Sequence, residues 1–114
     1  MKFDQNRDLV EMLFKCAAEC EYCTTMCLEE DNVKTLTKCI KLNLMCSQVC
    51  ITTAIATARE SIHAEHLIKE CIEICELCAK ECAKHDTQHC KKCADICSTC
   101  AEKCKNSELA VTHN

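Results

Sequence analysis

The residues of this chain that can do chemistry are its cysteines, which number sixteen among 114 residues. Most of them fall on one repeated spacing, C-x3-C-x2-C-x3-C. The complete copies are Cys16/Cys20/Cys23/Cys27, Cys71/Cys75/Cys78/Cys82 and Cys93/Cys97/Cys100/Cys104, and a fourth copy, Cys39/Asn43/Cys46/Cys50, has one substitution. Cys90 is the thiol outside the repeat. Thiols in such numbers indicate the binding of soft metal ions or thiol redox chemistry.

Charge favours copper(I) among the metals. Sixteen buried thiolates carry more charge than a domain of this size can absorb without bound cations. Zinc held by four thiolates leaves each site doubly negative, and zinc ligands usually lie on loops. Copper(I) is monovalent and selects thiolates, so bridging thiolates let metal and sulfur approach a one-to-one ratio. We therefore expect multiple Cu(I) ions per chain, with all sixteen cysteines as ligands.

Other thiol chemistries remain as alternatives. A zinc or general thiolate metal sink fits the cysteine count, and so does a thiol-redox protein or a bundle held by disulfides. Redox-active C-x2-C pairs usually begin a helix, which only Cys90/Cys93 does here. Iron–sulfur motifs of the familiar kind lie in loops, whereas this chain has no glycine or proline. We expect no enzyme activity.

The elements that position these thiols are helices. Steps of four, three and four residues keep side chains on one helix face. The absence of glycine and proline removes the usual hairpin turns. We expect helices over about 4–29, 33–59, 61–84 and 87–104. Asn32 should take the left-handed conformation after the first helix, Ser61 should cap the third, and Asp86 or Thr87 the fourth.

Short connections between long helices predict an all-α fold, an antiparallel up-down-up-down four-helix bundle with a cysteine-lined core. The bundle domain should span residues 1–105, followed by a frayed polar tail over 106–114. Antiparallel pairing also predicts which thiols share a level. The layers are Cys16/Cys50/Cys71/Cys104, Cys20/Cys46/Cys75/Cys100, Cys23/Asn43/Cys78/Cys97 and Cys27/Cys39/Cys82/Cys93.

The two ends of this predicted column differ in chemistry. One end is an apolar plug made of Leu9, Met12, Leu13, Ala54, Leu67 and Ile68. The other end, which we call the mouth, holds Glu30, Leu36, His85, His89 and Cys90. His85 and His89 are one helical turn apart and are either solvated surface residues or copper entry ligands. Asn43 is either a tolerated gap in the column or a device that fixes register.

A further apolar line on the second helix, offset from its cysteines, is formed by Ile40, Leu44, Ile51 and Ile55. It serves either lateral packing on a neighbouring helix or a subunit interface.

Composition excludes several partners. The net charge is −4 with acidic and basic residues interspersed, which gives no footprint for nucleic acid. No stretch approaches the roughly 20 apolar residues of a membrane span. The first residues carry charges where a secretion signal needs an apolar run, so we expect a cytoplasmic protein. A reducing compartment disfavours structural disulfides.

The chain resembles the four-helix-bundle copper storage proteins, in particular their cytosolic branch. The resemblance covers about residues 4–104 and is carried by AECEYCTTMC at 18–27, IEICELCAKEC at 72–82 and KKCADICSTCAEKC at 91–104. It implies core-facing thiols that bind many Cu(I) ions for storage or sequestration, and entry of metal at a histidine-bearing end. It also implies a homotetramer, with copper donor or acceptor proteins as partners.

Overall fold

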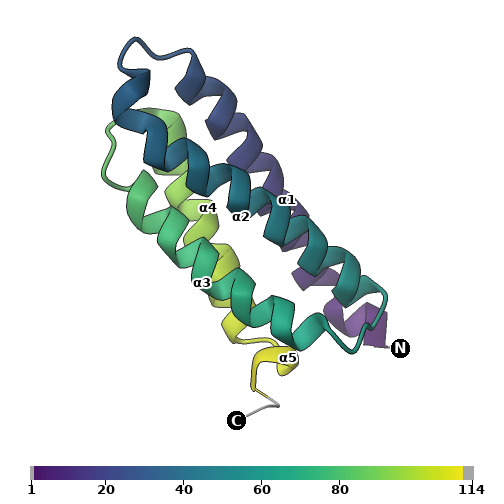
Figure 1. Ribbon diagram of the computed structural model, residues 1–114. Coiled ribbons are helices and arrows are strands. Elements are labelled where there is room, and N and C mark those ends of the chain that lie inside the picture. The colour runs from purple at the N-terminus through teal and green to yellow at the C-terminus, as the bar shows by residue number, and fades with distance from the viewer. Residues whose placement is uncertain (1, 112–114) are drawn as a thin grey trace.

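The thiol-bearing segments form four long helices packed side by side, as Figure 1 shows. The computed structural model describes residues 2–111. The long helices are α1 (Lys2–Leu28), α2 (Thr37–Ala58), α3 (Ala64–Cys82) and α4 (Gln88–Lys105), and the short ones are η1 (Val33–Leu36) and α5 (Glu108–Val111). The bundle is long and narrow, with extents of 48 × 23 × 18 Å. The predicted all-α four-helix bundle is confirmed.

The connection between α1 and α2 differs from the prediction. Asn32 is not left-handed, with φ −95° and ψ 36°, and it precedes a 3-10 turn that occupies the expected start of the second helix. Its side-chain amide donates to Thr35 Oγ1, and its carbonyl accepts from the Thr35 backbone. Asparagine side chains form such local bonds readily, and this one holds the tighter turn.

The left-handed residue of the described chain is Glu60, with φ 56°. It follows α2, where the Glu60 amide donates to the Thr57 carbonyl and the Ser61 amide to the Ala56 carbonyl. This pair of bonds is the Schellman arrangement, which normally ends in glycine. A chain without glycine has to place an ordinary residue there, at a cost of about 1 kcal/mol or more.

The helix starts follow local hydrogen bonding. Thr87 caps α4 as predicted, because its Oγ1 accepts from the Cys90 amide at 3.3 Å. Ser61 does not cap α3, whose first helical residue is Ala64. Ser61 Oγ instead accepts from the His63 amide at 3.1 Å, in the turn before the helix. Polar side chains in turns commonly compete in this way with a cap.

The predicted apolar plug is present at one end of the helical core. At the plug, Leu13, Ala54 and Ile68 are fully buried, as predicted, and at the mouth Leu36 is 1% exposed. The tail is more ordered than expected, since α5 forms over 108–111 and Leu109 and Ala110 pack against the core. The remaining predicted tail residues, 112–114, lie outside the described residues.

The prediction that no stretch approaches a membrane span is wrong on composition alone. Val33–Ala58 is long and apolar enough to cross a membrane, with a mean hydropathy of 1.4 over an 18-residue window. The core helix of a soluble protein meets the same criterion, and 44% of that window is buried inside the bundle. In this structure α2 occupies the position of a core helix, between α1 and α3.

Candidate metal centre

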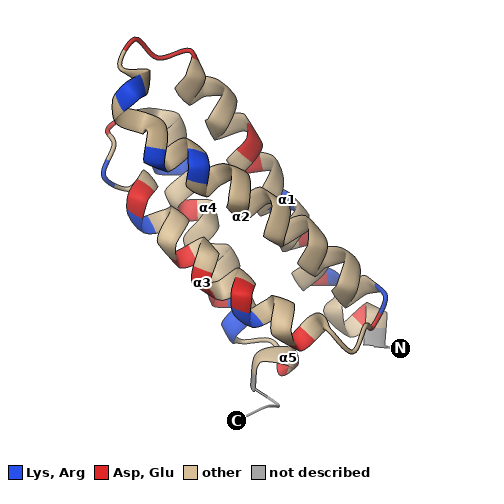
Figure 2. Ribbon diagram, in the orientation of Figure 1, with Lys and Arg blue, Asp and Glu red and all other residues tan. Residues whose placement is uncertain are grey.

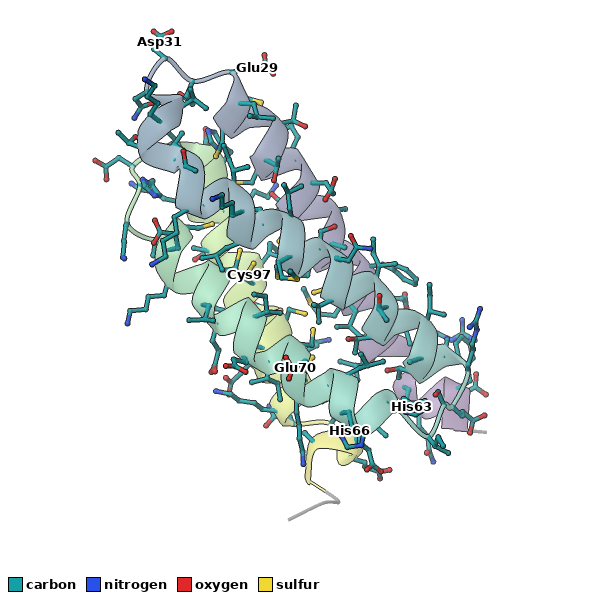
Figure 3. All side chains as sticks on the ribbon, in the orientation of Figure 1. Glu29, Asp31, His63, His66, Glu70 and Cys97 are labelled. Carbon is teal, nitrogen blue, oxygen red and sulfur yellow. The ribbon has the colours of Figure 1, made fainter. Side chains whose placement is uncertain are left out.

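The sixteen cysteines form one continuous sulfur column along the axis of the bundle. Every one of them is fully buried and none is in a disulfide. Figure 3 shows sulfur atoms lying between the helices, with Cys97 near the middle. Each helix turns its four-three-four cysteine face inward, because that spacing keeps side chains on one side of an α-helix. The predicted cysteine-lined core is confirmed.

The register between α2 and α3 matches the predicted layers. Three pairs of sulfur atoms from the same predicted layers meet across this helix pair, and they are Cys50–Cys71 at 3.6 Å, Cys46–Cys75 at 3.6 Å and Cys39–Cys82 at 3.2 Å. Cys50 also contacts Cys75 of the next layer, at 3.7 Å. These distances far exceed the roughly 2.05 Å of a disulfide bond, so the sulfurs touch without being joined.

The register of α1 against α4 is displaced by about one position of the cysteine ladder, so the flat layers predicted there are wrong. Cys16 and Cys20 both contact Cys97, at 3.8 and 3.6 Å, rather than Cys104 and Cys100. Cys27 contacts Cys90, at 3.8 Å, rather than Cys93. Cys90 is therefore part of the column.

The same displacement is seen at the plug end of the bundle. Leu9 borders the same surface hollow as Asn106 and Ser107, and Met12 the same hollow as Lys103. Residues that precede Cys16 thus occupy the level of the last turn of α4. The spacing of cysteines along each helix predicts that they share one face. It does not predict how far one helix is shifted along its neighbour.

Groups of four thiols lie close enough to share one metal ion, with their sulfur atoms within 4.8 Å of one another. They include Cys16/Cys46/Cys50/Cys75, Cys16/Cys20/Cys46/Cys97, Cys20/Cys78/Cys93/Cys97, Cys23/Cys27/Cys39/Cys90 and Cys50/Cys71/Cys75/Cys100. Several thiols belong to two groups. One sulfur can therefore bridge two ions, and the arrangement suits a multinuclear cluster better than separate mononuclear sites.

The thiols share their protons through S–H···S contacts. Contact with Cys100, followed by contact with Cys20, lowers the pKa of Cys16, whereas contact with Cys16 raises the pKa of Cys20. One sulfur of each contact donates the proton and the other accepts it, which explains the opposite directions. A neutral hydrogen-bonded column avoids the cost of buried charge.

Asn43 lies within the column and is fully buried. Its Oδ1 accepts hydrogen bonds from the thiols of Cys78 at 3.0 Å, Cys93 at 3.3 Å and Cys82 at 3.6 Å, and its Nδ2 donates to Cys39 at 3.7 Å. The Asn43 side chain thus contacts thiols on three helices, α2, α3 and α4. This bonding supports the reading of Asn43 as a register device rather than a gap.

At the mouth, His89 joins the thiols. Its Nδ1 lies 3.6 Å from Cys23, 3.9 Å from Cys27 and 3.6 Å from Cys90. Its Nε2 lies 3.7 Å from a carboxylate oxygen of Glu30. Imidazole nitrogen and thiolate sulfur are both ligands for copper and zinc, so this end of the column can hold a metal ion.

His85 points to a different partner. Its Nε2 lies 3.1 Å from Oε2 of Glu81, and it hydrogen-bonds to no thiol of the described chain. Burial raises the pKa of Glu81, but hydrogen bonds from His85 and Lys84 and the charges of Lys84 and Lys38 outweigh it, so the pKa lies below its usual range. The two histidines that the sequence placed together therefore have separate surroundings.

Charged residues gather around this mouth. Figure 2 shows the acidic connection after α1, which includes Glu29, Glu30 and Asp31, close to the lysines of η1 and the first turns of α2. Sequence reasoning missed Glu81, which is 7% exposed although charged. The available signal was its position four residues before His85 on a helix, a spacing that places two side chains together.

Comparisons with known proteins agree with this geometry. The family model "Copper storage protein" matches residues 2–109. The cysteine-rich protein YhjQ of Bacillus subtilis (strain 168) is 38% identical over 82 residues, covering 72% of this chain and 76% of that protein.

Two solved structures are similar in sequence and in fold. The Cu(I)-bound copper storage protein BsCsp3 has a TM-score of 0.84 and 37% identity, covering 88% of this chain and 94% of that one. A cytosolic copper storage protein from Streptomyces lividans, in a copper-loading structure with five coppers, has a TM-score of 0.87 and 32% identity. It covers 95% of this chain and 93% of that one.

Replacing Asn43 with alanine should destabilise the reduced, metal-free protein. Three buried thiols lose their shared acceptor, which costs about 1 to 3 kcal/mol in the free energy of unfolding. Chemical denaturation followed by circular dichroism measures the change. Ser47→Ala, a buried polar change on the same helix, is the matched control and should have little effect. Equal effects of the two substitutions would show that Asn43 does not organise the column.

Proposed function

The chain belongs to the copper storage protein family, and from this premise we propose how it stores copper(I). The single observation that carries the proposal is the column of sixteen free, fully buried thiols. As thiolates they bind many Cu(I) ions and hold the metal away from water. The solved relative BsCsp3 is Cu(I)-bound, and the Streptomyces lividans protein holds five coppers in the structure compared above.

Copper(I) suits this column because each ion brings a single positive charge. Sulfur atoms at 3.6 to 4.0 Å, as in Cys50–Cys71 and Cys46–Cys50, allow one thiolate to contact more than one ion. A metal-to-sulfur ratio near one leaves the core close to neutral. If the column held zinc instead, with four thiolates bound to each ion, it would remain strongly negative.

The ligands in this proposal are the sixteen cysteines, together with His89 and His85 at the mouth. His89 is the better supported of the two histidines, because its Nδ1 contacts three thiols. His85 contacts Glu81 beside the lysines of the mouth, so its assignment as a ligand rests on the sequence prediction. Copper enters at the mouth, because the other end is closed by the apolar plug.

The protein sequesters metal and we assign it no catalytic role. We place it in the cytoplasm, in keeping with the cytosolic relative from Streptomyces lividans. In that compartment copper(I) reaches it from donor proteins and leaves it to acceptors. Its bundle domain ends near residue 105, and α5 is an addition that packs on that domain.

A homotetramer is part of the proposal. Of the apolar line on α2, Ile40 packs against the core, whereas Leu44, Ile51 and Ile55 are 47%, 39% and 38% exposed. Lateral packing within the bundle therefore leaves most of the line uncovered. A second copy of this chain, with the same apolar line, covers it by isologous contact.

Titration of the reduced protein with copper(I) should reach on the order of one ion per cysteine. With no tryptophan and a single tyrosine, the chain absorbs little near the ultraviolet bands of copper(I) thiolates, so binding is easily followed. Native mass spectrometry gives the stoichiometry. Saturation at about four ions per chain, with zinc outcompeting copper(I), contradicts storage in a bridged column.

Replacing His85 and His89 with alanine should slow copper loading or release by about tenfold while leaving the total capacity almost unchanged. The thiol column is intact in this variant, and only the mouth is altered. The single variant His89→Ala should account for most of the effect, because His85 contacts Glu81 rather than a thiol. Stopped-flow absorbance measures the rate.

The control for the mouth is the pair of exposed histidines His63 and His66, which lie at the opposite end of the bundle (Figure 3). Their replacement by alanine should leave the loading rate unchanged. Equally fast exchange in the His85/His89 double variant would mean that copper enters elsewhere.

The variant Ile51→Lys should convert the assembly to smaller species, because it places a charge in the middle of the exposed apolar line of α2. Analytical ultracentrifugation of the reduced protein measures the mass. Leu77→Lys on α3, where the side chain is 48% exposed, is the control and should leave the assembly intact. A parent protein that is a monomer or a dimer would refute the tetramer.

A further inference from the structure

Four ligand atoms at the mouth form a nearly regular tetrahedron. The sulfurs of Cys23, Cys27 and Cys90 are 3.9, 4.0 and 3.8 Å apart. Nδ1 of His89 lies 3.6, 3.9 and 3.6 Å from these sulfurs. With Zn–S bonds of about 2.3 Å and Zn–N bonds of about 2.0 to 2.1 Å, a tetrahedral Cys3His site has edges of about 3.8 and 3.5 Å. The four atoms already have nearly that spacing.

The second nitrogen of His89 independently points to a metal ligand. The side chain is 9% exposed, and Nε2 is buried without a hydrogen-bond partner among the described residues. A carboxylate oxygen of Glu30 lies 3.7 Å from it. Histidines that bind metals usually give their other N–H to a carboxylate, which fixes the tautomer. A proton on Nε2, facing Glu30, leaves the Nδ1 lone pair directed at the three thiols.

A zinc site at the mouth would carry less negative charge than a zinc site inside the column. Zinc with three thiolates and a neutral imidazole carries half the excess negative charge of a four-thiolate site. His89 and Cys90 lie in the first turn of α4, after the Thr87 cap. Burial raises the pKa of Cys90, and the positive end of the helix dipole opposes that effect by favouring a thiolate. The charge argument against zinc in the buried column is therefore much weaker at the mouth.

The fourth ligand is His89 rather than Cys39. The Cys39 sulfur lies within 4.8 Å of the three thiols, but it is engaged on the other side of the core. It contacts the Cys82 sulfur at 3.2 Å and accepts a hydrogen bond from Asn43. His89 has no competing partner except the Glu30 carboxylate, which supports binding.

We propose that Cys23, Cys27, Cys90 and His89 form a mononuclear tetrahedral zinc site at the mouth of the bundle. Zinc binds there in the copper-free protein, and the three thiol protons are released to solvent as the thiolates coordinate. The inference goes beyond copper storage, because it assigns a second metal to the ligands at the mouth. Copper(I) that enters the column displaces this ion, since the same thiols begin the column.

The experiment adds zinc alone to the reduced full-length protein and counts bound ions by native mass spectrometry, with a chromophoric chelator as competitor. The expected result is one tightly held zinc ion per chain. Cobalt(II) in place of zinc should give the intense visible bands of a tetrahedral thiolate site. Binding of no zinc, or of several ions with equal affinity, overturns the proposal.

Variants test which residues hold the ion. His89→Ala and Cys90→Ser should each weaken zinc binding by at least about tenfold. Cys104→Ser, at the far end of the column, and His66→Ala, on the surface, should leave it unchanged. Equal weakening by Cys104→Ser shows a general thiolate sink, and loss in Cys39→Ser with none in His89→Ala assigns the fourth ligand to Cys39. Either result overturns the site proposed here.

Two further measurements keep the outcomes separate. Circular dichroism of each variant confirms that the bundle is folded before zinc is added. Copper(I) capacity is measured on the same samples. A protein that stores copper but binds no zinc would refute the zinc site and leave the copper-storage proposal standing.

Discussion

The electrostatic cost of buried thiolates is the constraint on which the rest of this structure depends. A thiol packs as a small hydrophobic group when protonated, and the metal-free bundle keeps its sulfurs neutral by sharing protons between neighbouring thiols. Once metal binds, the protons leave and the charge has to be matched ion by ion. The close sulfur contacts and the preference for a monovalent metal both follow from this balance.

The sequence predicts those parts of the fold that depend on periodicity. The four-three-four spacing and the lack of glycine and proline are sufficient for the helices, their inward faces and the plug at Leu13 and Ile68. The contacts between α2 and α3 follow as well. The slide of α1 against α4 does not, because it depends on how the side chains of the two helices pack together. The residue pattern within one helix carries no information about packing between two helices.

The same limit explains the errors in detail. Cys90 breaks the repeat in sequence yet contacts Cys23 and Cys27, because the displaced α1 brings them to its level. His85 and His89 are four residues apart in the sequence, but their partners differ. His85 pairs with Glu81, whereas His89 contacts the thiols. The left-handed turn was expected at Asn32 and occurs at Glu60. Helix ends depend on local competition for backbone hydrogen bonds, which residue type alone does not decide.

The apolar plug has a consequence for the order in which metal is exchanged. If copper exchanges only at the mouth, as proposed above, the bundle works as a last-in, first-out store. Ions beside the mouth would then leave first, and ions at the level of Cys50 and Cys71, next to the plug, would leave only after those nearer the mouth. Such a store has a rapidly exchanging fraction and a reserve.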